Sequence, residues 1–135
     1  NPNDVLALNA LGVAKFSMGA LLSKNAKTTA DRKEVNHFYK EAESLFQQAN
    51  RSDGSFSASY YNLGNVYLMQ ARPADAEAAY RQAIILSPGT PQYHADLAAA
   101  LWQEKRAPEA RTEALIAMNR GYTKHWIFDK LNLNR

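Results

Sequence analysis

Apolar residues in the middle of this 135-residue chain recur at the spacing of two short helices. Leu63 and Tyr67 lie four positions apart, so together with Gly64 they share one face of a predicted helix. A second set with the same spacing follows, comprising Ala76, Tyr80 and Ala83. A break at 71–73, which ends in a proline, separates the two sets. The pattern predicts a helical hairpin across residues 57–90.

Gly64 stands in the middle of the first predicted helix, where glycine costs roughly 0.5–1 kcal/mol relative to alanine. Ala76 and Ala83 offer small side chains at matching positions of the second helix. We therefore predict that Gly64 lies at a close contact between the two helices, where the absence of a side chain lets their axes approach.

The same residues stand in a characteristic order, Tyr60-x-x-Leu63-Gly64-x-x-Tyr67, then Ala76-x-x-x-Tyr80, Ala83 and Pro88. In this order and spacing the segment resembles the tetratricopeptide repeat, a helix-turn-helix unit of 34 residues. The resemblance implies an all-α fold, namely a right-handed α-solenoid of helix-turn-helix hairpins. It also implies that residues 57–90 form one repeat within a single domain over 1–135.

Residues 91–122 resemble the next copy of this unit. Adding the 34-residue period to Gly64 gives Ala98, another small residue. Ala114 stands where the family usually carries an aromatic residue, which suggests a terminal repeat. Terminal repeats need a cover for their exposed face, and we predict a C-terminal capping helix within 123–135.

The upstream part resembles a first repeat of about 5–56 with an irregular middle. Its two halves are visible as Leu8-x-x-Leu11-Gly12 and Ala42-x-x-x-Phe46, but about 18 extra residues separate them relative to the 34-residue unit. We therefore predict two elongated helices, roughly 4–22 and 31–51. Asp31 with Glu34 resembles a capping pair for the second helix. Asn1-Pro2-Asn3-Asp4 resembles the end of another repeat, which predicts that the chain is part of a longer array.

Composition narrows the function further. The formal net charge is +3, the three histidines are scattered, and cysteine is absent. A charge this mild does not indicate nucleic-acid binding, and no histidine pair has the spacing of a zinc site. No serine elbow, phosphate-binding glycine loop or catalytic carboxylate pair is visible. We predict that the chain is not an enzyme and needs no cofactor or metal. The composition leaves open whether the domain is cytoplasmic or periplasmic.

No apolar run is predicted to approach the roughly 18–20 residues that a membrane span requires, so direct membrane insertion is not expected.

The resemblance also implies where a ligand would bind. In tetratricopeptide repeat proteins the first helix of each pair lines the concave face and supplies most ligand contacts. Carried onto this sequence, that rule gives a peptide-binding groove made of Asn9, Val13, Phe16, Tyr61, Asn65, Leu68, Met69, Trp102 and Gln103. The amides would hydrogen-bond a peptide backbone, and the aromatic rings would bury its side chains. We therefore predict a non-catalytic scaffold that binds a peptide or protein segment.

Two alternatives stay open. Trp102 could pack against a following helix, or a C-terminal segment could fill the groove. The chain could also be an assembly module that self-associates through the array ends or through the long first hairpin, which would make it a homo-oligomer.

One subtype of the family can be recognised by the residues at five positions. Its members grip the acidic C-terminal tail of heat-shock chaperones through lysine, arginine and asparagine side chains. The corresponding places here hold Asn9, Val13, Asn62, Gln92 and Asp96. Only Asn62 matches, and Asp96 would repel a carboxylate. We predict that this clamp is absent.

Overall fold

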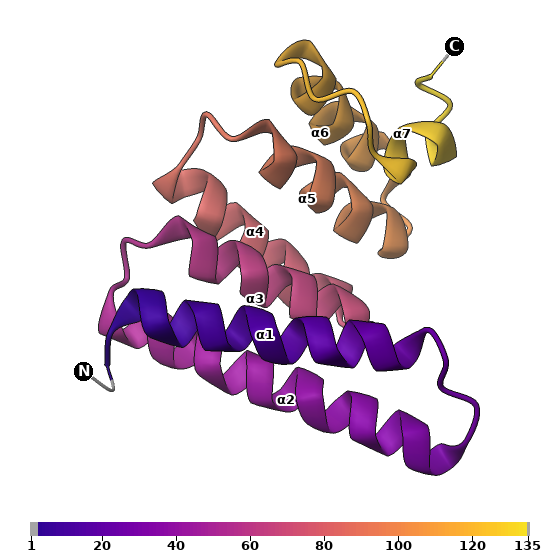
Figure 1. The fold of residues 1–135 in the computed structure, drawn as a ribbon. Helices are drawn as coiled ribbons and strands as arrows, with labels where there is room; N and C mark the ends of the chain where they lie inside the picture. The colour runs from indigo at the N-terminus through magenta and orange to yellow at the C-terminus, as the bar shows by residue number, and fades with distance from the viewer. Residues whose placement is uncertain (1–2, 135) are drawn as a thin grey trace.

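The computed structural model of the chain describes residues 3–134, which form seven helices and no strand. The helices are α1 (Val5–Ser23), α2 (Thr29–Ser52), α3 (Ser57–Met69), α4 (Pro73–Leu86), α5 (Pro91–Gln103), α6 (Ala107–Asn119) and α7 (Trp126–Lys130). Asn1 and Pro2 of the predicted upstream tail, and Arg135 of the predicted cap, lie outside the described residues. The all-α prediction is confirmed (Figure 1).

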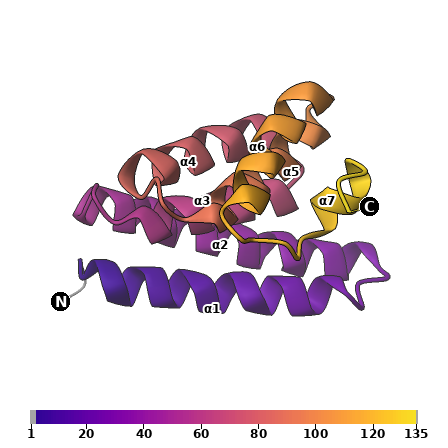
Figure 2. The same cartoon turned by 90° about the horizontal axis from the view of Figure 1, so that it is seen from above.

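Consecutive helices pack as pairs, α1 with α2, α3 with α4, and α5 with α6. Each pair also contacts the next one, because α2 packs on α3 and α4 packs on α5. Figure 1 shows the pairs following one another from the indigo to the orange end of the chain. In Figure 2, α1 lies on one side of the molecule and α4 and α6 lie on the other. This arrangement is the right-handed α-solenoid that the repeat pattern predicts.

In the first two hairpins an aromatic ring of the second helix lies directly on a glycine of the first helix. A methyl group added at Gly64 would come within 2.5 Å of the Tyr80 ring, and one added at Gly12 would come within 2.6 Å of the Phe46 ring. Both Tyr80 and Phe46 are almost completely buried. The predicted close contact at Gly64 is therefore confirmed, and its physical reason is room for a ring.

The third hairpin solves the same packing problem with smaller residues. Ala98 stands one 34-residue period after Gly64, and Ala114 stands one period after Tyr80. Both alanines are fully buried in one core cluster. Where the first helix gains a methyl group, the second helix therefore gives up its ring. This exchange explains the departure from the family pattern at Ala114.

The ends of two helices show how local sequence sets their boundaries. The Thr28 hydroxyl accepts a hydrogen bond from the Asp31 backbone N–H, and an Asp31 carboxylate oxygen accepts one from the Thr28 N–H, both at 3.0 Å. The predicted capping pair of Asp31 with Glu34 was therefore wrong, because the capping box pairs Asp31 with a residue upstream. Hydrogen bonds from the backbone N–H groups of Lys27 and Thr28 lower the pKa of Asp31. After α6, Gly121 has a φ of 91°, a left-handed conformation suited to glycine.

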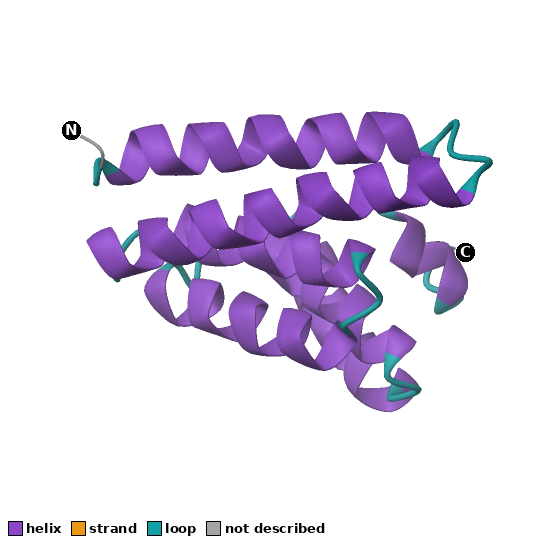
Figure 3. Cartoon of the chain, turned by 90° about the horizontal axis from the view of Figure 1, so that it is seen from below, coloured by secondary structure: helices purple, strands orange, loops and turns teal. Residues whose placement is uncertain are grey.

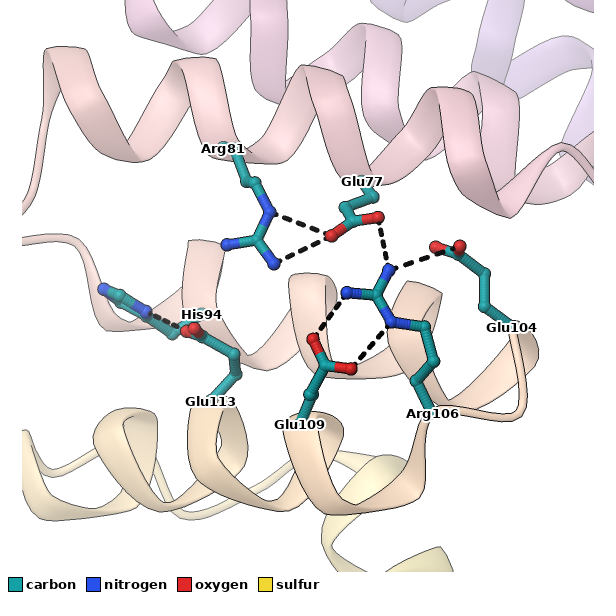
Figure 4. Close-up of polar contacts among 7 residues, drawn as sticks. All are labelled: Glu77, Arg81, His94, Glu104, Arg106, Glu109 and Glu113. Carbon is teal, nitrogen blue, oxygen red and sulfur yellow. Dashed lines mark hydrogen bonds and ion pairs between the residues drawn. The ribbon is translucent and has the colours of Figure 1, made fainter.

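An ion-pair network joins the second and third hairpins (Figure 4). Arg106, which precedes α6, donates from Nη1 to Glu77 of α4 at 2.7 Å and from Nε and Nη2 to Glu109. Arg81 donates two further hydrogen bonds to Glu77. Burial raises the pKa of Glu77, but the two guanidinium groups outweigh it and hold that pKa below its ordinary value. The ionised Glu77 carboxylate therefore stabilises the folded state above the ordinary glutamate pKa of about 4.3, and this contribution is lost as the pH falls below it.

The same network recurs one repeat earlier. Arg72, which precedes α4, bonds Glu43 of α2 at 3.2 Å and Asp75 of its own helix at 2.9 Å. One period after Glu77 the chain carries Arg111 instead of an acceptor, and its guanidinium donates to the Leu131 carbonyl at 2.8 Å. The repeated contact between hairpins is thus replaced by a contact with the C-terminal cap.

His94 of α5 belongs to the same side of the molecule (Figure 4). Its Nε2 lies 3.1 Å from an Arg120 guanidinium nitrogen, and its Nδ1 lies 2.7 Å from a Glu113 oxygen. A guanidinium group can only donate, so Nε2 accepts and the ring proton sits on Nδ1, where it is donated to Glu113. His94 is buried.

Helix α1 is apolar on nearly every side, although only Leu8, Gly12 and Gly19 are buried. Its 19 residues are long and apolar enough, by length and composition, to cross a membrane. The prediction that no run approaches this length was wrong, because Asn9 and Lys15 interrupt the sequence without making the helix polar on average. Core helices and signal sequences have the same properties, so these properties alone do not indicate a membrane span.

Candidate functional site

The first helices of the three hairpins contact one another along one side of the solenoid. Across the first boundary, the Asn62 amide donates to the Asn9 side-chain oxygen at 2.9 Å. Across the second, the Tyr61 hydroxyl donates to Asp96 at 2.6 Å. We call the surface shared by α1, α3 and α5 the inner face. It holds the predicted groove residues Asn9 and Tyr61.

Tyr61 is the central aromatic residue of the inner face, and it is half-buried. Its ring stacks on Tyr93 with the ring centres 4.6 Å apart. Its hydroxyl donates to Asp96 and accepts a hydrogen bond from the Gln92 amide at 2.8 Å. The side chain predicted to anchor a ligand is therefore already fixed by three neighbours from α5.

The loop before α7 brings His125 onto the inner face. Its Nε2 lies 2.9 Å from the second oxygen of Asp96, and its Nδ1 lies 3.2 Å from the Ile127 backbone N–H. The backbone N–H must donate, so Nδ1 accepts and Nε2 carries the proton that bonds Asp96. His125 therefore caps α7 and fixes it to α5 at the same time.

Trp102 lies where the inner face meets the cap. Its ring makes an edge-to-face contact with Trp126 of α7, with the centres 6.0 Å apart, and the Lys130 ammonium lies 5.9 Å from its centre. The alternative in which Trp102 packs against a following helix therefore describes this contact with α7. One edge of Trp102 still borders an open hollow of about 430 Å³ between α5, α6 and α7, which Pro108 also lines.

The other predicted groove residues divide by exposure. Val13 and Met69 are 40% and 49% exposed. Asn65 accepts a hydrogen bond from the Tyr80 hydroxyl at 2.7 Å. Phe16, Leu68 and Gln103 are half-buried. Phe16 packs against the core of the first hairpin, and Leu68 packs against the core of the later ones. All of these predicted groove residues belong to α1, α3 and α5, the three helices that share the inner face.

Comparison with known proteins identifies the fold. The family described as "Tetratricopeptide repeat" matches residues 28–91 and 61–118, which together exceed half of the chain. The chain belongs to the tetratricopeptide repeat family. No curated protein matches the sequence.

Several solved tetratricopeptide repeat structures superpose on this chain. The first repeat domain of Spaghetti (RPAP3), bound to the HSP90 peptide SRMEEVD, is 16% identical with a TM-score of 0.78, covering 98% of this chain and 90% of that one. The first repeat domain of human RPAP3 is 17% identical with the same TM-score and the same coverage. TTC0263, a tetratricopeptide repeat protein of Thermus thermophilus, is 20% identical with a TM-score of 0.78, covering 98% of this chain and 64% of that one. At these identities the likeness shows the fold.

The electrostatics of the inner face of this tetratricopeptide repeat protein centre on Asp96, whose carboxylate accepts hydrogen bonds from Tyr61 and His125. Burial, and then the nearby Asp96 charge, raise the pKa of Tyr61 well above its ordinary value. The same two causes raise the pKa of Tyr80. Both phenols therefore stay protonated and keep donating at alkaline pH.

The sequence predicted a role for Tyr61 but not the hydrogen-bonded group that it forms with Asp96 and His125. Asp96 and His125 lie 29 positions apart and join only because the loop after α6 returns across α5. No local pattern marks such a contact, since neither residue stands at a framework position of the repeat. Among residues 3–134, no group of histidine, aspartate or glutamate side chains is arranged to hold a metal ion.

We expect the stability of the protein to fall as the pH rises above about 10. The unfolded chain ionises its tyrosines above this pH, whereas the folded state holds the pKa of Tyr61 and Tyr80 higher. The contribution of these two phenols to stability is therefore complete below this pH and is lost as the pH rises above it. Urea denaturation between about pH 8 and 11 measures this loss. In Tyr61→Phe the decline should be shallower, and an unchanged slope would contradict the assignment.

Proposed function

We propose that this protein is a non-catalytic scaffold that binds a peptide or protein segment along its inner face. The observation that carries the proposal is the presence of exposed apolar side chains, Val13 and Met69, beside amide groups on a surface formed by three separate helices. Apolar side chains of a partner can be buried there, while the amides satisfy its backbone. Solenoid repeats create extended surfaces of this kind.

The chemistry of the inner face favours an uncharged, apolar segment. The carboxylate of Asp96 is already hydrogen-bonded to Tyr61 and His125, so it offers little to a cationic ligand. Neither Lys nor Arg stands at the five places where chaperone-binding relatives hold an acidic tail. The proposed partner is therefore a segment that presents apolar side chains rather than a terminal carboxylate.

A peptide selected from a random displayed library against the full chain gives a probe for this site. Met69→Asp should weaken its binding at least tenfold, which corresponds to about 1.4 kcal/mol, because a charge would replace an apolar contact. Fluorescence anisotropy of the labelled peptide measures the affinity. The peptide SRMEEVD should bind far more weakly than the selected one, because neither Lys nor Arg stands at the five places that would hold its carboxylates.

The matched control is Ile85→Asp, since Ile85 is an apolar side chain of α4 that is 72% exposed and lies outside the inner face. It should leave the affinity unchanged. A selected peptide that binds wild type, Met69→Asp and Val13→Asp equally well would show that the inner face is not the binding site.

A further inference from the structure

The side of α1 that points away from the first hairpin is an exposed apolar surface. Figure 3 shows α1 along the edge of the molecule, packed on one side only. We call this surface the outer face of α1, and it consists of Ala7, Ala10, Leu11, Ala14, Met18 and Leu21. Leu11, Met18 and Leu21 are 49%, 48% and 65% exposed. The outer face carries no charged residue. Helices that are apolar all round are normally covered.

The outer face corresponds to surfaces that are covered elsewhere in the molecule. Leu11 occupies the place of Leu63 and Leu97 in the next two repeats, which are only 7% and 1% exposed. Ala14 occupies the place of Val66, which is completely buried between hairpins. The outer face is therefore built like a junction between hairpins, but none of residues 3–134 covers it.

We propose that the outer face of α1 packs against the same face of a second copy, in an antiparallel two-fold pair centred on Ala14. Ala14 is the midpoint of the helix Val5–Ser23. Under this symmetry Ala7 of one copy lies opposite Leu21 of the other, and Leu11 lies beside Met18, one position out of exact register. Leu11 also borders an open hollow of about 460 Å³ between α1 and α2, which gives the incoming Met18 side chain room.

An antiparallel pair fits the side chains better than a parallel one. In a parallel pair, Leu21 would face Leu21 and Ala7 would face Ala7, so the helices would be held apart at one end and leave a gap at the other. The antiparallel pair sets one small and one large residue at both ends, which keeps the helix spacing even and the packing dense.

The charges at the ends of α1 agree with this direction. Asp4 caps the N-terminus of the helix and Lys24 follows its C-terminus. An antiparallel pair brings the Asp4 end of each copy to the Lys24 end of the other, whereas a parallel pair would bring like charges together. The two helix dipoles also oppose each other in the antiparallel arrangement.

The area available suits a weak but specific dimer. Half the circumference of a 19-residue helix, about 28 Å long and about 11 Å across, is roughly 500 Å² per copy. The two copies together would bury about 1,000 Å², the lower bound for a specific interface. Interfaces at this end of the size range are typical of weak, transient association.

Two other covers are less compatible with the contacts of the first hairpin. At both internal junctions an arginine before the second helix, Arg72 or Arg106, binds a glutamate of the preceding hairpin, but Thr28 holds that place before α2. A further hairpin stacked in the same way would lack this bond. A membrane that covered α1 would also have to accommodate the ion pair between Lys15 and Glu41, whose charged atoms lie 2.9 Å apart.

Sedimentation velocity over a concentration series of the full 15.1 kDa chain tests the proposal. The wild type should pass from monomer to dimer. Ala14→Glu should weaken the dimer at least tenfold, because it places two carboxylates at the two-fold axis. Ala78→Glu, the same substitution at an exposed alanine of α4, should have no effect. A strictly monomeric wild type, or a dimer that Ala14→Glu leaves intact, would overturn the proposal.

The absence of cysteine allows a second, geometric test. Under oxidising conditions Ala14→Cys should form a disulfide-linked dimer, whereas Ala78→Cys should not. A dimer that Ala14→Glu dissociates but Ala14→Cys does not cross-link would exclude the pair centred on Ala14.

Flotation of a monomeric wild type with vesicles of phosphatidylcholine and phosphatidylglycerol, abolished by Ala14→Glu, would assign the outer face to a membrane instead. Affinity for the selected peptide should be unchanged by Ala14→Glu, so each proposal can fail without the other.

Discussion

Replacing Tyr80 by alanine should lower the free energy of unfolding by about 3–5 kcal/mol, the range observed when a large buried aromatic side chain is removed from a core. Tyr80 is completely buried, and its ring fills the space that Gly64 leaves open between α3 and α4. Neither helix can close the resulting cavity without moving its axis. Urea denaturation followed by circular dichroism at 222 nm measures the change.

Ile85→Ala is the matched control for this experiment, because Ile85 lies on the same helix and is 72% exposed. It should change the stability by less than about 0.5 kcal/mol. Tyr80→Phe keeps the ring and removes only the hydrogen bond to Asn65, which should cost about 1 kcal/mol. If Tyr80→Ala cost no more than Tyr80→Phe, the ring would not be the element that holds the hairpin together.

The features that sequence could predict are those fixed by the 34-residue period. The close contact at Gly64 follows from local spacing, because a glycine in mid-helix and an aromatic residue on the next helix must fall opposite each other when the hairpin closes. The same period predicts Ala98 as its counterpart. Such contacts depend on neighbouring helices joined by short turns, so they leave a pattern in the sequence.

The features that sequence missed depend on how distant or irregular segments meet. The hydrogen bond from His125 to Asp96 forms because the loop after α6 returns across α5, and no spacing rule describes that path. For the same reason, the sequence could name Trp102 as a groove residue but could not decide whether Trp126 would cover it. The apolar character of α1 was also underestimated, since Lys15 interrupts the run yet leaves the helix surface apolar.

These misses change what the inner face can offer a partner. The three aromatic residues predicted for the groove, Phe16, Tyr61 and Trp102, already have aromatic partners in Tyr39, Tyr93 and Trp126. The remaining exposed apolar side chains, Val13 and Met69, lie toward the first two hairpins. The binding surface we propose is therefore displaced toward the N-terminal half of the solenoid, away from the cap.

The third hairpin carries Ala98 and Ala114 where the second carries Gly64 and Tyr80, and this difference leads to a further prediction. Gly64→Ala should destabilise the protein by about 1–3 kcal/mol, although alanine is the better helix former. The added methyl group would lie 2.5 Å from the Tyr80 ring, which is fully buried and has little room to move. Gly89→Ala is the control, because a methyl group there meets nothing within 4 Å. It should alter the stability by less than about 0.5 kcal/mol, measured by the same urea denaturation.

In the background of Tyr80→Ala the sign should reverse. Once the ring is gone, the methyl group of Gly64→Ala enters empty space, and the gain in helix propensity of about 0.5–1 kcal/mol should appear as added stability. The double variant reproduces the pair Ala98 and Ala114, which the third hairpin buries completely. The coupling energy between the two sites should therefore exceed about 1.5 kcal/mol, within the range measured for residues in direct contact. Additive effects of the two substitutions would mean that the glycine and the ring do not share one space, and the packing rule inferred for all three hairpins would not hold.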